Sequence, residues 1–419
     1  MAKFIIRGRK VLRGEVVTPG NKNAALSMLA ATLLTEDECV LEKMPKIGDV
    51  LVMGEILQKI GVRIRGMGSE QWVVNAAGVN KTELDSGLVS KLRASVLLLG
   101  PMVARFGRVT MRHPGGCEIG RRAVGTHFEA LEALGVETVT TEMNYQSRVK
   151  RLQSARIFLD EASVTATENV LMAASLIEGE TVIEDAACEP HVVDLANFLR
   201  AMGAKIGGAG TNVIRVAGVK KLAGARGVVG PDFMDVAAMA VATAVTSGEA
   251  VIKRVQESDL AMIALYLGRM GLRYELKAGE MKILPSKLVA PKGKIQTRPW
   301  PGFPTDVMST FVVLATQAEG LTLCHDWMYE SRMFFVDKLI AMGANITLCD
   351  PHRVLVSGPT QLRGKVVDSP DIRAGMALVC AALCAEGESV INNAEVIERG
   401  YEEIEARLRG LGAEIKRVE

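Results

Sequence analysis

The sequence has few aromatic residues and almost no net charge. Its 10 Phe, 5 Tyr and 3 Trp are few for 419 residues, and Trp72, Trp300 and Trp327 are too scattered to form a stacking surface for single-stranded nucleic acid. A formal net charge of +2 provides no field along the whole chain that would hold a nucleic acid or an acidic membrane surface. We therefore expect no nucleic-acid partner, and any anion site must be local.

The chain also lacks paired cysteines, metal motifs and long apolar runs. Its seven cysteines include no C-x-x-C pair, which argues against a disulfide framework or a zinc ribbon and favours a reducing cytoplasm. No cluster has metal-ligand spacing and no G-x-G-x-x-G is present, so we expect no metal and no dinucleotide cofactor. No stretch reaches the roughly 18 apolar residues that span a bilayer, and residues 1–14 lack the apolar segment of a signal peptide. These absences predict a cytoplasmic protein without a membrane anchor.

What the chain does contain is a repeated pattern. The phrase apolar-x-x-apolar-Gly-apolar recurs every 68 to 74 residues, which is typical of a helix that ends at a glycine and leads into a strand. Its glycines are Gly61, Gly135, Gly203, Gly271, Gly343 and Gly412. A second set follows apolar helical runs at the same period, namely Gly107, Gly179, Gly248, Gly320 and Gly387. We predict an α/β protein built from six copies of a unit of about 70 residues, arranged as two lobes of three copies.

Six predicted apolar helices, of which five end at the second set of glycines and the first ends at Glu36-Asp37, begin with polar or charged residues. Cap-type residues such as Ser163 and Asp371 suit a helix N-terminus, where backbone N–H groups lack partners. Cations such as Lys22, Arg93 and Arg373 are disfavoured at a helix N-terminus, because the positive end of the helix dipole lies at that end. Six ordinary N-caps would explain the first group but not the cations. The pattern therefore predicts a binding site for a strongly anionic ligand.

A glycine-flanked loop at residues 113–122 holds a single cysteine beside two arginines. Positive neighbours favour the thiolate form of Cys117 and hence its reactivity. An isolated cysteine is also commonly a small buried hydrophobic residue, and the loop by itself leaves both interpretations open. It is not a phosphate-binding loop of the Gly-Lys-Ser/Thr type, because no such tripeptide closes it.

Phrases along nearly the whole chain resemble the enolpyruvyl transferases, in the order in which that family has them. The resemblance is strongest to the branch that uses UDP-N-acetylglucosamine, since the shikimate-phosphate branch lacks the cysteine loop. The matching phrases are Pro19-Gly20-Asn21-Lys22-Asn23-Ala24, Leu92-Arg93-Ala94-Ser95, Pro114-Gly115-Gly116-Cys117-x-Ile119-Gly120-x-Arg122, Glu189-Pro190, Phe303-Pro304-Thr305-Asp306, Tyr329-Glu330-Ser331-Arg332, Asp371-Ile372-Arg373-Ala374 and Glu398-Arg399-Gly400-Tyr401-Glu402.

The resemblance implies a fold and a reaction. The fold would be a two-lobed inside-out α/β barrel, with residues 21–229 in the first lobe and residues 1–20 with 230–419 in the second. The reaction would move the enolpyruvyl group of phosphoenolpyruvate to the 3-hydroxyl of UDP-N-acetylglucosamine and release phosphate, the first committed step of peptidoglycan synthesis. The expected partners are thus this donor and a sugar-nucleotide-like acceptor, with no cofactor. In this family fosfomycin alkylates the loop cysteine.

The family's site residues carry over to matching positions of this chain. The resemblance implies that Cys117 exchanges a proton with the methylene carbon of the donor and that Asp306 removes the proton of the acceptor hydroxyl. Lys22 and Arg399 complete the expected catalytic set. Without the resemblance, Asp306 would be taken as a helix cap. The residues expected to bind substrates are Asn23, Arg93, Arg122, Ser163, Val164, Glu330, Arg332 and Arg373.

The chain departs from the family where the nucleotide is held. After the cysteine loop the family reads Arg-Pro-Val-Asp-Leu-His, whereas this chain has Ala123, Gly125 and Thr126 in place of the Pro, Asp and Leu. The family's Lys-Val-Ser-Val-Gly becomes 161–165 here, with Glu161 in place of the lysine. Two alternatives therefore stay open, namely an enolpyruvyl transferase with a different hydroxyl acceptor and a catalytically silent binding relative. The sequence does not predict the oligomeric state.

Overall fold

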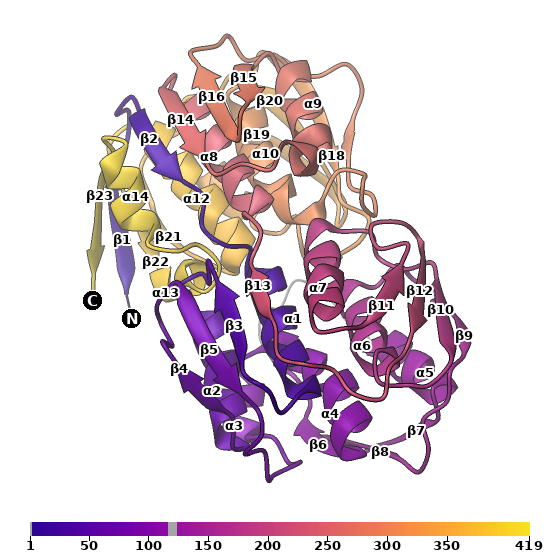
Figure 1. Cartoon of the computed structure of the whole chain (residues 1–419). Helices are drawn as coiled ribbons and strands as arrows, with labels where there is room; N and C mark the ends of the chain where they lie inside the picture. The colour runs from indigo at the N-terminus through magenta and orange to yellow at the C-terminus, as the bar shows by residue number, and fades with distance from the viewer. Residues whose placement is uncertain (1, 116–123) are drawn as a thin grey trace. The chain divides into compact units, whose positions relative to one another are not determined.

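The computed structural model describes residues 2–115 and 124–419, and these residues form two compact units (Figure 1). The first unit consists of residues 20–115 and 124–230, and the second consists of residues 2–19 and 231–419. Each unit has an apolar core of its own, rich in Leu, Val, Ile, Ala and Met.

The first unit contains three sheets in its described part. Their strand orders are β13-β3-β5-β4, β11-β12-β10-β9 and β6-β8-β7. The strands are β3 (Cys39–Glu42), β4 (Arg63–Arg65), β5 (Gln71–Asn75), β6 (Arg108–Arg112), β7 (Val136–Thr140), β8 (Asn144–Val149), β9 (Arg156–Phe158), β10 (Glu180–Glu184), β11 (Lys205–Gly207), β12 (Val213–Ala217) and β13 (Arg226–Val228). Most strands alternate buried and exposed residues, so one face of each sheet packs on the core.

The helices of the first unit differ in how completely they are buried. Helices α1 (Lys22–Ala31) and α6 (Val164–Ala174) bury almost every residue after their first turn, so they form the centre of the core. The other helices are η1 (Thr32–Leu34), α2 (Gly48–Lys59), α3 (Ser86–Val89), η2 (Arg93–Leu98), α4 (Leu99–Phe106), α5 (Gly125–Ala133) and α7 (Pro190–Ala201). Because only the starts of α1 and α6 are partly exposed, their functional side chains are confined to those starts.

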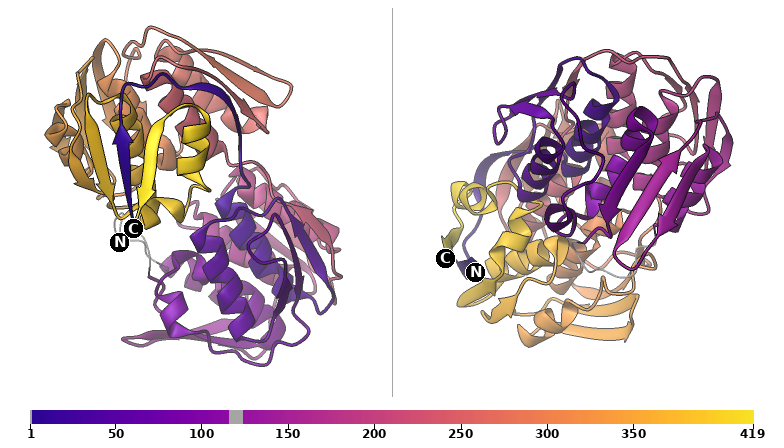
Figure 2. Two further views of the ribbon diagram at one scale, coloured as in Figure 1. Left: turned by 90° about the vertical axis from the view of Figure 1, so that its left-hand side faces the viewer. Right: turned by 90° about the horizontal axis from the view of Figure 1, so that it is seen from below.

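The second unit also has three sheets among its described residues. Their orders are β21-β22-β1-β23, β15-β16-β14-β2 and β17-β18-β20-β19. The strands are β1 (Lys3–Arg7), β2 (Arg13–Val17), β14 (Glu249–Lys253), β15 (Arg273–Lys277), β16 (Glu280–Leu284), β17 (Ile295–Gln296), β18 (Gly320–His325), β19 (Asn345–Asp350), β20 (Arg353–Gly358), β21 (Val366–Asp368), β22 (Glu388–Asn392) and β23 (Glu414–Val418). Strand β1 pairs with both β22 and β23, so the two ends of the chain lie side by side in both views of Figure 2.

Three apolar helices fill the core of the second unit and contact one another. They are α8 (Phe233–Val245), α10 (Thr305–Thr316) and α12 (Ile372–Cys384), seen together in Figure 1. Every residue of α8 is buried, as are nearly all of α10 and α12. The remaining helices are η3 (Glu257–Leu260), α9 (Ala261–Arg269), α11 (Val336–Ala341), α13 (Ala394–Glu398) and α14 (Ile404–Gly410). Helices this apolar are stable only when other elements surround them.

The two sets of recurring glycines behave differently. All six glycines of the first set have positive φ, as the prediction of helix C-caps requires. At Gly61, for example, φ is +108°, and a Cβ atom would lie 2.3 Å from the carbonyl oxygen of Gly78. In the second set Gly248 is the exception, because Ser247 takes the left-handed conformation instead. A Cβ at Gly248 would lie 2.3 Å from the Leu12 carbonyl oxygen, so close approach of the backbone explains this glycine.

The helix predicted to run from the region of Arg93 to Gly107 is interrupted in the structure. Residues Arg93–Leu98 form the 3-10 helix η2, and the α-helix begins only at Leu99. Pro101 explains the change, because a proline in the interior of an α-helix removes a hydrogen bond and clashes with the preceding turn. Pro101 lies in the first turn of α4, where backbone N–H groups have no intrahelical partner, so an α-helix can begin at Leu99. The other predicted helix starts, at Lys22, Val164, Phe233, Thr305 and Ile372, agree with the structure.

In the part of the chain that the structure describes, no helix is long and apolar enough to cross a membrane. The same residues contain no group of three or more His, Cys, Asp or Glu side chains arranged to hold a metal ion.

Candidate active site

The start of α1 presents two of the predicted site residues in the first unit. The side-chain oxygen Oδ1 of Asn21 accepts hydrogen bonds from the backbone N–H groups of Asn23, at 2.9 Å, and of Ala24, at 3.0 Å. This cap starts the helix at Lys22. Residues 24–31 are all buried, so the partly exposed part of α1 consists of Lys22 and Asn23.

Lys22 has a carboxylate beside it that sequence reasoning did not identify. Its Nζ atom lies 3.2 Å from Oδ2 of Asp49, which occupies the first turn of α2. The side chains are 14% and 7% exposed, so the pair is largely removed from water. No motif surrounds Asp49. The available signal was the rule that a buried cation near a helix N-terminus needs an anion close by.

Arg93 contributes positive charge near the start of α6. Its Nη1 atom lies 3.5 Å from the carbonyl oxygen of Pro114. Burial and, to a smaller extent, the charge of Arg93 together lower the pKa of His127 to about 4, so His127 is neutral at pH 7. The predicted substrate-binding residue Arg93 is thus electrostatically coupled to this buried histidine.

The neutral ring of His127 joins α5 to α6. Its Nδ1 lies 3.1 Å from Nδ2 of Asn169, and its Nε2 lies 3.0 Å from Oγ1 of Thr165. The backbone N–H of Gly100 donates to Oδ1 of Asn169, which fixes the orientation of that amide. The Nδ2 group can only donate, so Nδ1 of His127 is the unprotonated nitrogen and Nε2–H donates to Thr165. His127 therefore holds the two helix starts together.

The start of α6 carries Ser163 and Val164. Ser163 caps the helix, with its Oγ 3.5 Å from the N–H of Ala166, and Val164 is the first helical residue. Both side chains are half-buried. Glu161, which replaces the family's lysine, is exposed. A hydroxyl hydrogen bond from Thr126 to Asp160, at 2.7 Å, ties the same loop to α5.

In the second unit, Asp306 lies between two buried arginines. Its Oδ1 accepts a hydrogen bond from Nη2 of Arg332 at 2.9 Å, and its Oδ2 accepts one from Nε of Arg373 at 3.1 Å. The Asp306 side chain is 31% exposed, whereas those of Arg332 and Arg373 are 1% and 4% exposed. Three predicted site residues therefore meet at the first turns of α10 and α12, with the carboxylate as the accessible member.

Further acids and an aromatic ring keep the two arginines charged inside the protein. Arg332 is also 4.0 Å from carboxylate oxygens of Asp326 and Asp371. Burial alone would lower the pKa of Arg373, but Tyr401 and Asp306 outweigh that effect and raise it above its ordinary value. The guanidinium of Arg373 also stacks over the ring of Tyr401, 5.3 Å from its centre.

Asp326, which sequence reasoning did not identify, lies beside this cluster and helps to hold it in place. Its side chain is fully buried and accepts hydrogen bonds from the hydroxyls of Thr297 and Thr305 and from the N–H of Met328. Burial raises the pKa of Asp326, and these hydrogen bonds and Arg332 oppose the rise. The short side chain fixes Thr305 and hence the beginning of α10, where Asp306 lies.

Two further predicted residues lie at a helix end and in a turn of the second unit. Arg399 is the C-cap of α13 and is half-buried, and Glu330 is exposed in the turn before Arg332. Cys117 and Arg122 lie outside the residues that the structure describes. Lys22, Asn23, Arg93, Ser163 and Val164 thus belong to the first unit, and Asp306, Glu330, Arg332, Arg373 and Arg399 belong to the second.

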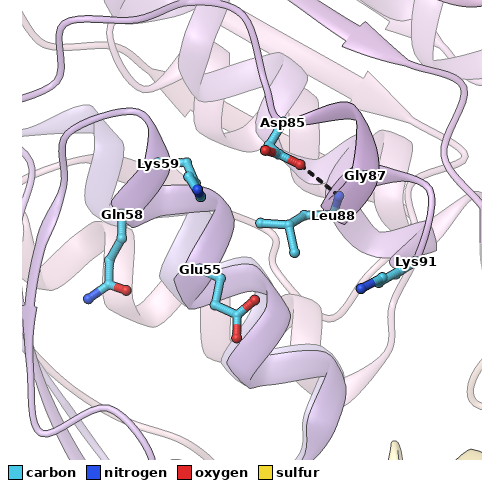
Figure 3. Close-up of a pocket in the computed structure, with 7 residues that line it drawn as sticks. All are labelled: Glu55, Gln58, Lys59, Asp85, Gly87, Leu88 and Lys91. Atoms are coloured by element: carbon cyan, nitrogen blue, oxygen red, sulfur yellow. Dashed lines mark hydrogen bonds between the residues drawn. The ribbon is translucent and has the colours of Figure 1, made fainter.

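A surface hollow of about 450 Å³ in the first unit contains none of the predicted site residues (Figure 3). Glu55 and Lys59 line it from α2, and Asp85 and Lys91 line it from either side of α3. Charges of both signs alternate around it, and an oxygen of Asp85 already accepts the N–H of Leu88 at 3.0 Å. The hollow therefore lacks the concentrated positive charge that an anionic substrate requires.

Comparison with known proteins identifies the family. The sequence matches the model of EPSP synthase (3-phosphoshikimate 1-carboxyvinyltransferase) over residues 6–408. The chain belongs to the EPSP synthase family. Relatives that resemble it over their full length include UDP-N-acetylglucosamine 1-carboxyvinyltransferases. The one from Borreliella burgdorferi is 47% identical over 425 residues, covering 100% of this chain and 99% of the relative. The one from Bacteroides thetaiotaomicron is 42% identical over 434 residues, covering 100% of both.

Two solved structures have the same fold. The enolpyruvyl transferase NikO from Streptomyces tendae has a TM-score of 0.89 at 24% identity, covering 100% of this chain and 99% of NikO. An EPSP synthase from Acinetobacter baumannii has a TM-score of 0.77 at 20% identity, covering 100% of both chains. The predicted mixed α/β fold and the predicted family are therefore confirmed.

The first unit of this EPSP synthase family member also buries two carboxyls, one near the start of α6 and one at the start of α7. Burial raises the pKa of Glu189 to about 7 and that of Glu168 well above its usual range, and the charge of Glu189 raises the latter further. Oε2 of Glu189 and Oε1 of Glu168 are buried and have no hydrogen-bond partner among the residues described. An ionised Glu189 therefore destabilises the folded protein.

This burial predicts how stability changes with pH. The folded protein holds the Glu189 proton up to about pH 7, whereas the unfolded chain releases it near 4.5, so stability falls as pH rises between those values. The cost at pH 8 is on the order of 3 kcal/mol, from a pKa shift of about 2.5 at about 1.36 kcal/mol per unit. We expect Glu189→Gln to raise Tm by several degrees at pH 8 and by much less at pH 5, measured by differential scanning calorimetry. The exposed Glu55→Gln serves as control, and an equal gain at both pH values would contradict the assignment.

Proposed function

We propose that this protein transfers the enolpyruvyl group of phosphoenolpyruvate to the 3-hydroxyl of UDP-N-acetylglucosamine and releases phosphate, the first committed step of peptidoglycan synthesis. The observation that carries the proposal is full-length identity of 42% to 47% with relatives named for that transfer. The cluster of Asp306 with buried arginines supports it, because an accessible carboxylate beside cations suits a base that works next to an anionic donor.

Donor binding is assigned to Lys22, Arg122, Arg373 and Arg399. Phosphoenolpyruvate carries a phosphate and a carboxylate, and planar guanidinium groups match both in two-point contacts. Arg373 is held by Asp306 in the structure, at 3.1 Å. A bound donor competes for this guanidinium and frees one oxygen of Asp306 for the acceptor hydroxyl. Arg332, only 1% exposed, keeps the carboxylate in place during that exchange.

The reaction has two chemical steps, an addition and an elimination. Each step combines a proton transfer with the formation or breaking of a carbon–oxygen bond. In the addition step Asp306 takes the proton of the 3-hydroxyl, the oxygen bonds to C2 of the donor, and Cys117 delivers a proton to the methylene carbon. The product is a tetrahedral ketal phosphate. In the elimination step the Cys117 thiolate takes a proton back from the methyl carbon, the bond from C2 to the phosphate oxygen breaks, and phosphate leaves. Each positioned acid or base typically contributes about 10²–10⁴-fold to such a reaction.

Acceptor binding is assigned to Asn23, Arg93, Ser163, Val164 and Glu330. The starts of α1 and α6 and the nearby charge of Arg93 support this, because helix N-termini and cations suit a diphosphate. The exposed Glu161 removes a cation that the family normally supplies there. Arg93 and the N-terminus of α6 then hold the diphosphate without that lysine.

The proposal includes the arrangement of the chain. The two units correspond to two lobes, residues 21–229 and residues 1–20 with 230–419, each built from three copies of a strand and helix unit. Together the lobes form the inside-out barrel of the family. Three sheets among the described residues of each unit, and core helices whose polar starts carry the site residues, support this assignment.

The test of the proposal is phosphate release from phosphoenolpyruvate with a panel of hydroxyl acceptors. We expect release with UDP-N-acetylglucosamine and none without an acceptor. Release with only another nucleotide sugar or a nucleoside monophosphate would establish a transferase with a different acceptor. No release with any acceptor, together with no donor binding by calorimetry, would identify a silent relative.

A further inference from the structure

We propose that Asp49 is a positioning residue for the donor, acting by holding the ammonium group of Lys22 where it meets the donor's anionic groups. The juxtaposition that carries this inference is the 3.2 Å contact between Lys22 Nζ and Asp49 Oδ2 at the paired starts of α1 and α2. The inference rests on the proposed function, because it assumes that Lys22 contacts phosphoenolpyruvate.

The helix that carries Lys22 does not favour its charge. Lys22 is the first residue of α1, directly after the Asn21 cap, and the backbone N–H groups there form the positive end of the helix dipole. Its side chain is 14% exposed, so water screens the charge only in part. A flexible lysine in this position needs an anion to keep its ammonium group at one place.

Asp49 is well placed to be that anion. It lies in the first turn of α2, whose preceding residue Ile47 makes no side-chain cap, so the positive end of that helix favours a carboxylate there. Helices α1 and α2 contact each other, and the Asp49 side chain is 7% exposed. The carboxylate is thus fixed by its own helix and presents Oδ2 to Lys22.

The geometry leaves the lysine able to act on a ligand. An ammonium group has three N–H donors, and the contact with Oδ2 of Asp49 uses one of them. A second lysine pair of the same unit, Lys43 with Glu70 at 3.0 Å, differs in its surroundings, because its side chains are 51% and 59% exposed. That pair is solvated and can be broken at little cost. It provides a matched control.

Two different roles of Asp49 predict opposite changes in donor affinity when its charge is removed. A positioning carboxylate keeps the ammonium group in the donor site, so removing its charge weakens donor binding. A competing carboxylate occupies Lys22 until the donor displaces it, so removing its charge strengthens donor binding. The partly buried contact at the helix starts favours positioning, since Asp49 and a ligand on the accessible side can share the three N–H groups.

The test compares Asp49→Asn, Asp49→Glu and Glu70→Gln in the full-length protein. We expect Asp49→Asn to raise KM for phosphoenolpyruvate roughly 10-fold, with KM for the acceptor within about twofold and Tm nearly unchanged. Asp49→Glu should recover part of the loss, and Glu70→Gln should behave as the unchanged protein. Calorimetric titration with phosphoenolpyruvate alone should show the same order of affinities.

A double-mutant cycle with Lys22→Met shows whether Asp49 acts through the lysine. In the Lys22→Met protein, adding Asp49→Asn should change donor affinity by less than about twofold. An equal loss in both backgrounds, a gain in donor affinity for Asp49→Asn, or no effect would overturn the inference. Failure of the unchanged protein to bind phosphoenolpyruvate would instead overturn the proposed function.

Discussion

Replacing Asp306 by asparagine is expected to lower kcat by about 10²–10⁴-fold, the range typical of a lost general base. Asparagine keeps the shape of the side chain and one oxygen for Arg332 or Arg373, but it cannot take the proton of the acceptor hydroxyl. Donor affinity should persist or rise, because Arg373 loses a competing negative charge. Turnover and calorimetric affinity for phosphoenolpyruvate measure the two effects separately.

Asp306→Ala should lose turnover to the same extent but should also lose stability, since it leaves two buried guanidinium groups without their shared partner. The matched control is Asp350→Asn, which removes a carboxylate whose side chain is 30% exposed, much like that of Asp306, and which is bonded to Arg353 at 2.6 Å in the same unit. This control should keep full turnover. An Asp306→Asn protein with turnover within a few-fold of the unchanged enzyme would remove Asp306 from the role of base.

The second large effect is expected at Cys117. Fosfomycin should add its mass to Cys117, and Cys117→Ala should lower turnover by about 10²–10⁴-fold if the thiol delivers a proton to the donor. Intact-mass and peptide mass spectrometry check the site of addition. Activity of the Cys117→Ala protein, measured by phosphate release, checks its role.

The other cysteines provide the control for this reaction. Burial raises the pKa of Cys324 and of Cys384 to about 12, so their thiols stay protonated and unreactive. Cys349 is exposed and tests whether accessibility alone is sufficient. Addition to Cys349 while Cys117 stays unmodified would show that the loop cysteine is not activated.

Local sequence rules predict most helix boundaries of this protein. They fail where contacts between distant parts of the chain determine the local conformation. The Asn21 cap and Gly61 could be predicted because each acts on its own turn. Pro101 also acts locally, and the rule for proline indicates the interruption of the helix there. Gly248 depends on the backbone of Leu12, more than two hundred residues away in sequence, and no local rule contains that contact.

The same division applies to the candidate site. Family phrases indicate Asp306, Arg332 and Arg373. They do not reveal that both arginines are buried and that both form ion pairs with the same carboxylate. Asp49 and Asp326 belong to no motif, since each is defined by the cation or helix start it meets across the fold. Charged residues near helix starts predicted an anion site. The acidic residues that pair with those cations could be identified only from the structure.

The most direct test of the central claim is to follow the fate of the donor carbons. The protein is incubated with UDP-N-acetylglucosamine and phosphoenolpyruvate labelled with ¹³C at C2 and C3, and the product is examined by NMR and mass spectrometry. The account predicts a labelled vinyl ether at the 3-oxygen of the sugar, formed in equal amount with free phosphate. Phosphate with labelled pyruvate and an unmodified sugar nucleotide, or label on any other hydroxyl, would contradict it.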